Sequence, residues 1–83
     1  MSDQHKIAIL KILSEDAVAG KAVRYSFNTL SKNMGLSKDE IDVFLTELTK
    51  ARFVAQYAKK GVDSFTVEIK PAGLDAVLDG SFN

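Results

Sequence analysis

The sequence predicts a mixed α+β fold in a single domain that spans residues 1–83. Three observations carry this prediction. Apolar residues recur at helical spacing in four segments, they alternate with polar residues in a segment near the C-terminus, and glycines separate several of these segments. With 83 residues, of which 46% are hydrophobic and 27% charged, the chain has the composition of a small soluble globular domain with one modest core.

A first helix is predicted from Asp3 to about Val18, and Gly20 ends it. Its apolar residues fall at mixed spacings of three and four: Ile7, Ile9, Leu10, Ile12, Leu13 and Ala17. This apolar arc is wider than a single core contact requires. Either the helix is buried on two sides within one compact chain, or Ile9 and Ile12 remain exposed and form the seam of a homodimer.

A short strand and a second helix follow. Val23 and Tyr25 alternate as in a strand, and a short helix begins around Phe27. The inward residues predicted for this helix are Phe27, Leu30 and Met34. Gly35 is placed to end the helix in the left-handed backbone conformation.

A third helix is predicted from Ser37 through Ala51. Its inner stripe consists of Ile41, Phe44, Leu45 and Leu48. Ser37 and Glu40 have the spacing of a capping box, in which each side chain satisfies the backbone amide of the other residue. This spacing marks the start of the helix.

Two strands and a last helix complete the chain. The strands are predicted at residues 53–58 and 62–70, around a turn of Lys59, Lys60 and Gly61, and together they form a hairpin. The inward residues of the second strand are Phe65, Val67 and Ile69. Pro71 is well tolerated at a helix start, so a short helix is predicted after it. Its predicted core contacts are Leu74, Val77 and Leu78.

This order of elements resembles a winged helix-turn-helix domain, with a three-helix core, a β-hairpin wing and a short C-terminal helix. The family's paired helices and first wing strand resemble LSKNMGLSKDEIDVFLTELTKARFV, and its wing resembles YAKKGVDSFTVEI. The closing threonine, proline, lysine, glycine segment of many bacterial and archaeal regulators resembles IKPAGLDAVL. The chain departs from the family in having Ala51 and Arg52 where many relatives have a glycine, and Lys70 where a threonine is common.

The resemblance implies that the partner is double-stranded DNA, with the third helix in the major groove and the wing on the backbone. The predicted base-reading face consists of Lys38, Asp39, Asp42, Val43, Thr46 and Lys50. The predicted backbone contacts are Arg24, Lys32, Lys59 and Lys60, from the first strand, the second helix and the wing tip.

The third helix is rich in carboxylates, which DNA phosphates repel. Helix-start chemistry accounts for two of them, because Glu40 belongs to the capping box and the helix dipole favours Asp39 in the first turn. It does not account for Asp42 and Glu47, which count against simple reading of the groove.

The sequence therefore favours a small cytoplasmic DNA-binding protein, a transcriptional regulator that acts as a homodimer. The alternative is a winged-helix module that binds another protein and not DNA. The formal net charge of zero favours this alternative, because DNA-binding domains are usually basic, and so do the carboxylates of Asp39, Asp42 and Glu47 on the third helix. The basic residues that favour DNA are Arg24, Lys32, Lys59 and Lys60.

Enzyme chemistry is not predicted. The chain has no cysteine and a single histidine, His5, so a zinc set cannot be assembled from these ligands. The carboxylates of Asp39, Glu40 and Asp42 lack the dedicated loop of a calcium site, and we expect no metal and no cofactor. No apolar run approaches the roughly 20 residues that span a bilayer, so we expect no membrane partner.

Overall fold

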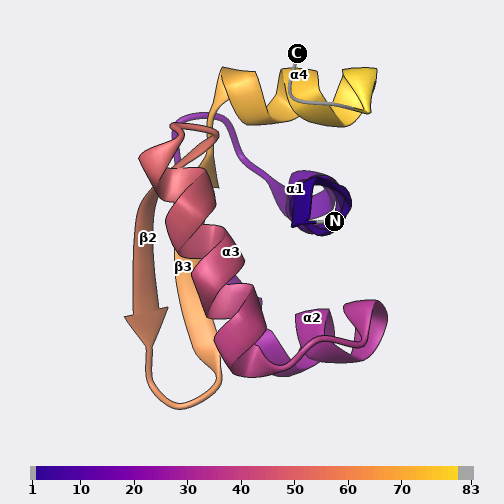
Figure 1. The fold of residues 1–83 in the computed structure, drawn as a ribbon. Coiled ribbons are helices and arrows are strands. Elements are labelled where there is room, and N and C mark those ends of the chain that lie inside the picture. The colour runs from indigo at the N-terminus through magenta and orange to yellow at the C-terminus, as the bar shows by residue number, and fades with distance from the viewer. Residues whose placement is uncertain (1, 81–83) are drawn as a thin grey trace.

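A computed structural model describes the backbone of residues 2–80 and the side chains from residue 4 onward. The elements are α1 (Ser2–Asp16), β1 (Val23–Ser26), α2 (Phe27–Met34), α3 (Lys38–Lys50), β2 (Val54–Lys60), β3 (Ser64–Ile69) and α4 (Pro71–Asp79). The three strands form an antiparallel sheet in the order β1-β3-β2 (Figure 1). The mixed α+β class predicted from the sequence is confirmed.

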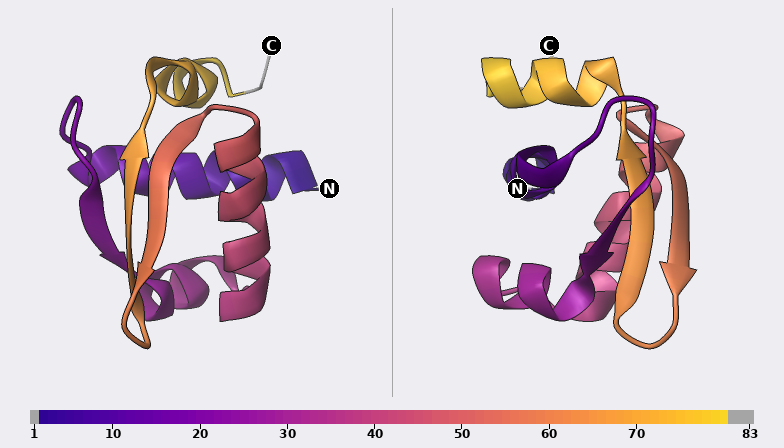
Figure 2. Two further views of the ribbon diagram at one scale, coloured as in Figure 1. Left: turned by 90° about the vertical axis from the view of Figure 1, so that its left-hand side faces the viewer. Right: turned by 180° about the vertical axis from the view of Figure 1, so that it is seen from behind.

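The sheet presents one apolar face to the helices. Phe65, Val67 and Ile69 alternate along β3 and are all buried, as predicted. β3 pairs with β1 on one side and β2 on the other, so its side chains lie at the centre of the sheet. Figure 2 shows α1 and α2 on one side of this sheet, with α3 running beside the hairpin of β2 and β3.

The first helix occupies the middle of the domain. In Figure 1 α1 is seen end-on between α4 and α2, and it packs against α2, α3, α4 and β3. Ile9 has 0% exposure, and Ile12 is partly buried against the same core. The predicted homodimer seam through Ile9 and Ile12 is therefore wrong for Ile9. Because α4 covers one side of α1, the wide apolar arc of this helix is buried by elements of the same chain.

The β2–β3 hairpin contains a bulge that the sequence did not predict. The register shifts between Ala55 and Ala58, and Gln56 takes a positive φ of 56°. The extra residue places both Val54 and Tyr57 on the inner side of the sheet, although they are three positions apart. The strand also runs on to Lys60, so the turn lies two residues later than predicted.

The last helix packs on its small residues. Gly73 and Ala76 are buried, whereas Leu74 is 41% exposed and Leu78 is 83% exposed. The prediction that these two leucines contact the core is wrong, and Val77 alone of the predicted three is partly buried. A Cβ on Gly73 would lie 2.4 Å from the carbonyl oxygen of Phe53, so glycine permits a close approach that turns the leucines outward.

None of the helices within residues 2–80 has both the length and the apolar character needed to cross a bilayer.

Candidate nucleic-acid interface

The start of α3 is built as predicted. The Ser37 hydroxyl oxygen accepts from the Glu40 amide at 3.2 Å, and Glu40 Oε1 accepts from the Ser37 amide at 3.0 Å. The hydrogen bond from the Ser37 backbone is the main cause that lowers the pKa of Glu40. The preceding turn is also as predicted, with Gly35 at φ 67° ending α2. The carboxylate of Glu40 is thus part of the helix start.

The carboxylate of Asp42 contacts the hairpin instead of extending freely from α3. Tyr57 donates its hydroxyl to Asp42 Oδ1 at 2.5 Å, and Lys59 Nζ lies 3.4 Å from Asp42 Oδ2. The Tyr57 hydrogen bond is the first cause that holds the pKa of Asp42 below its usual value. Asp42 was predicted on the base-reading face, but the structure gives its carboxylate two partners within the chain.

The bulge in β2 makes this contact geometrically feasible. Lys59 pairs with Phe65 in the sheet register and so lies on the inner side, next to α3. With strict alternation from Val54, Tyr57 and Lys59 would have faced the opposite side of the sheet. The positive φ of Gln56 reverses that alternation, and no residue in this segment signals it, because glycine is the usual residue at such a position.

The other unexplained acid of α3 also has a partner within the chain. Glu47 Oε1 lies 2.8 Å from Lys6 Nζ of α1. His5, one residue earlier on α1, places its ring 5.6 Å from that of Phe44. Both contacts join the N-terminal part of α1 to α3. The two carboxylates that counted against DNA binding therefore each face a lysine of the same chain.

Lys38 is exposed on α3, but its ammonium group is bound by the hairpin turn. Its Nζ donates to the carbonyl oxygen of Val62 in the hairpin turn and lies 5.2 Å from the centre of the Phe27 ring. These contacts join the first residue of α3 to the hairpin and to α2. Lys38 was predicted on the base-reading face, and the structure instead gives it this connecting position.

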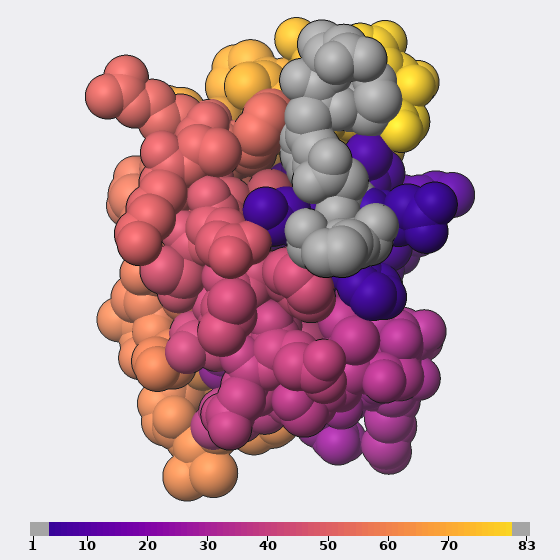
Figure 3. Space-filling view, viewed as in Figure 1, coloured from indigo at the N-terminus to yellow at the C-terminus, as the bar shows by residue number. Residues whose placement is uncertain are grey.

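Five residues of the predicted face are exposed on α3: Lys38, Asp39, Val43, Thr46 and Lys50. Of these, Lys38 is bound to the hairpin turn. Val43 is 52% exposed. Figure 3 shows the surface of α3 on the face toward the viewer, beside the hairpin. Arg52 follows the end of α3 and is also exposed, with φ at 66°.

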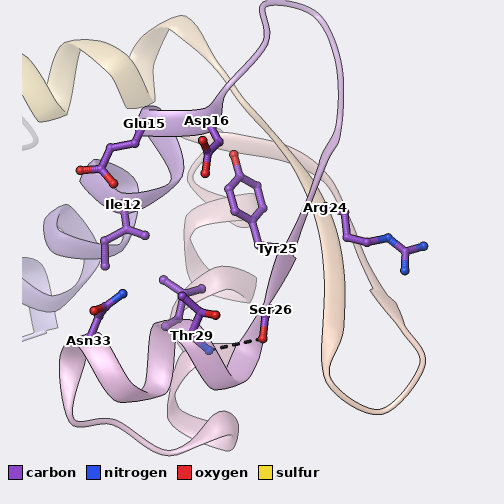
Figure 4. A pocket seen from close by; sticks show the side chains of 9 residues that line it. Ile12, Glu15, Asp16, Arg24, Tyr25, Ser26, Thr29 and Asn33 are labelled. Carbon is purple, nitrogen blue, oxygen red and sulfur yellow. Dashed lines mark hydrogen bonds between the residues drawn. The ribbon is translucent and has the colours of Figure 1, made fainter.

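The four predicted backbone contacts are not brought together. Lys59 faces α3 and Asp42, whereas Lys60 and Arg24 lie on the outer side of the sheet, as their register with Ser64 and Thr66 requires. Lys32 is exposed on α2. Figure 4 shows the Arg24 side chain extending away from the domain. Arg52 was not predicted as a backbone contact. It follows the last residue of α3 by two positions.

The hairpin turn is held to the start of α2 by Asp63. Its Oδ2 accepts from the Ser26 hydroxyl at 2.6 Å, and its Oδ1 accepts from the Asn28 amide at 3.0 Å. Its carbonyl oxygen accepts from the Phe27 amide at 2.6 Å. Together with Lys38, Asp63 fixes the hairpin turn against both α2 and α3. Sequence reasoning missed this residue because its partners lie more than 30 positions away.

A pocket of about 270 Å³ opens between α1, β1 and α2 (Figure 4). Its lining residues are Ile12, Glu15, Asp16, Arg24, Tyr25, Ser26, Thr29, Leu30 and Asn33. Tyr25 donates its hydroxyl to the Leu13 carbonyl at 2.7 Å, and burial followed by the charge of Asp16 raises the pKa of the phenol. The lining contains neither the histidine of this chain nor a pair of groups poised for nucleophilic catalysis.

Across the part of the chain that the structure describes, no group of three or more histidine, cysteine, aspartate or glutamate side chains is arranged to hold a metal ion. No protein-family profile, curated protein or solved structure matches this chain. The function is therefore inferred from the geometry of α3 and the hairpin.

Replacing Tyr57 with phenylalanine should reduce the loss of stability at alkaline pH. Burial, then the hydrogen bond to Asp42, raises the pKa of the Tyr57 phenol in the folded protein. Above about pH 10 an unfolded tyrosine ionises, whereas folded Tyr57 keeps its proton. The folded state then binds more protons, so the free energy of unfolding falls as pH rises.

Urea unfolding at pH 8 and at about pH 11 measures this effect, and Tyr25→Phe provides a second phenol with a raised pKa for comparison. An equal alkaline decrease in the wild type and in Tyr57→Phe would contradict the contribution of Tyr57.

Proposed function

We propose that this chain is a winged-helix domain that binds duplex DNA as a small transcriptional regulator. In this proposal α3 lies in the major groove and the β2–β3 hairpin lies beside the sugar-phosphate backbone. One observation carries it: Asp42 and Glu47 are ion-paired with Lys59 and Lys6. The order of elements and the β1-β3-β2 sheet agree with the arrangement expected of such a domain.

The C-terminal end of α3 supplies the cations for the phosphates in this proposal. Lys50 lies in the last turn of α3, and Arg52 follows two residues later. Arg52 has a left-handed backbone, which costs a residue with a side chain about 1–2 kcal/mol relative to glycine. An exposed arginine kept in a costly conformation supports a role in contacting a partner, since such outliers cluster at functional sites.

Fluorescence anisotropy with a random duplex of about 20 base pairs tests the proposal. The logarithm of the affinity should fall linearly with the logarithm of salt concentration between 50 and 200 mM, with a slope of about 0.9 per phosphate contact. The double variant Lys50→Ala and Arg52→Gly should lower that slope by about two. The absence of measurable binding at about 50 mM salt would contradict the proposal.

Two controls separate lost contacts from lost structure. The double variant Lys11→Ala and Lys21→Ala removes two exposed charges that belong neither to α3 nor to the hairpin, and it should leave the slope unchanged. Arg52→Gly alone should raise the free energy of unfolding by about 1 kcal/mol, because glycine adopts a positive φ without strain. Weaker binding by a more stable variant cannot result from unfolding.

The second candidate is a module that binds another protein. The net charge of zero favours it, and so do the exposed Leu74 and Leu78 on the outer side of α4. The acidic face of α3 no longer favours it, because Asp42 and Glu47 have partners within the chain. For this candidate we expect no measurable binding to any duplex at any salt concentration tested.

A further inference from the structure

The exposed middle of α3 carries two residues with methyl groups, beside the ion-paired Glu47. Val43 and Thr46 are both exposed and lie three positions apart, so they are neighbours on one face of the helix. Asp42 and Lys38, which could have bonded to base edges, are held by the hairpin. Asp39 and Lys50 remain at the two ends of this face.

The hydroxyl of Thr46 is already used within α3. Thr46 Oγ1 donates to the carbonyl oxygen of Asp42 at 2.9 Å. A hydroxyl has one proton, so this bond leaves Thr46 with a γ-methyl group and acceptor lone pairs for a partner. Val43 offers methyl groups alone. The centre of the face therefore presents methyl groups and no hydrogen-bond donor.

In the major groove, one base carries an apolar group that identifies it. Thymine presents a C5-methyl group beside its O4 acceptor, and apolar side chains or the threonine methyl read it by contact. We infer that Val43 and Thr46 select duplexes with thymine at two nearby positions by contacting these methyl groups. The inference rests on the proposed DNA binding and specifies which chemistry of the groove α3 reads.

The spacing of the two side chains fits this task. Residues three apart on a helix have Cβ atoms about 5–6 Å apart, and successive base pairs are separated by about 3.4 Å along the helix axis. Val43 and Thr46 thus reach methyl groups on base pairs one or two steps apart. Lys50 and Arg52 lie toward the C-terminal end of α3, where the phosphates are placed in the proposed function.

The test begins with selection of preferred sites from a random duplex library, using the whole chain. Each thymine of the selected site is then replaced by deoxyuridine, which removes the methyl group and keeps every hydrogen-bonding atom. At two positions the affinity measured by anisotropy should fall about fourfold each, the value for one buried methyl group at about 0.8 kcal/mol. Other thymines should show no change.

Conservative variants assign each position. Val43→Ala should abolish the difference between thymine and uracil at one position, and Thr46→Ser should abolish it at the other. Serine keeps the hydroxyl that bonds to Asp42 and loses only the methyl group. Val18→Ala is the matched control, because Val18 is 50% exposed between α1 and β1, outside α3 and the hairpin, and should leave both differences intact.

The outcomes separate this inference from the proposed function. Salt-dependent DNA binding with selected sites that lack thymine, or with no response to uracil, overturns the methyl contacts and leaves DNA binding standing. Absence of binding to any duplex overturns both and directs attention to a protein partner for the same exposed methyl groups.

Discussion

Replacing Phe65 with alanine is expected to destabilise the domain by about 3–5 kcal/mol, the usual range for removing a buried phenylalanine. Phe65 is fully buried at the centre of β3. Its ring lies 4.6 Å from that of Phe27 and 5.7 Å from that of Tyr57, measured between ring centres. Since native proteins are stable by only about 5–15 kcal/mol, this loss removes a large share of the free energy of unfolding.

Urea unfolding followed by circular dichroism measures this loss. Thr66→Ala is the matched control, because Thr66 is the next residue of the same strand and faces the outer side of the sheet. It should cost less than about 1 kcal/mol. Phe65→Leu keeps more of the apolar volume and supplies a measurable value if the alanine variant does not fold. Equal stability of Phe65→Ala and Thr66→Ala would contradict the packing described for β3.

Replacing Gly73 with alanine is expected to destabilise the domain by about 2–3 kcal/mol, as overpacking does in a tight core. The added Cβ would lie 2.4 Å from the Phe53 carbonyl oxygen and 2.9 Å from Cγ1 of Ile69. The first contact is with backbone, so α4 has to move. The higher helix propensity of alanine, worth about 1 kcal/mol, offsets only part of this cost.

The effect is measured in the same unfolding assay, with Asp75→Ala as the control on the exposed side of α4. Asp75→Ala improves helix propensity without adding a contact, so its stability should equal or slightly exceed that of the wild type. A Gly73→Ala variant that behaves like Asp75→Ala would show that α4 does not approach Phe53 closely.

The features that the sequence predicted correctly depend on local signals. The capping box of Ser37 and Glu40 and the left-handed stop at Gly35 each act within a few residues. Strict alternation placed the inner residues of β3 correctly, because that strand has no irregularity. These signals were sufficient for the order of the elements and for the α+β class.

The features that the sequence missed depend on contacts between distant segments. The inner face of α4 is set by the approach of Gly73 to Phe53, and hydrophobicity alone favoured the leucines. The apolar arc of α1 left burial within one chain and a dimer seam both open, and only the packing of α4 on α1 favours the first alternative. The bulge at Gln56 has no glycine to announce it.

The candidate site divides in the same way. Helical periodicity alone placed Asp39, Val43, Thr46 and Lys50 on the outside of α3, where the structure also has them. The contacts of Asp42 and Lys38 within the chain were not predicted, because their partners, Tyr57 and Val62, lie 15 and 24 positions away in the hairpin. Charge alone could not distinguish a carboxylate facing solvent from one bound by a phenol.

The hydrogen bonds that Asp63 accepts from Ser26 and Asn28 affect the thermodynamics of binding. A free hairpin arm loses conformational entropy when a partner orders it, which weakens the complex. Here the turn is fixed before any partner arrives, so that entropy loss has already occurred during folding. We therefore expect association to show a heat-capacity change that matches the contact area alone, without the additional term that accompanies coupled folding.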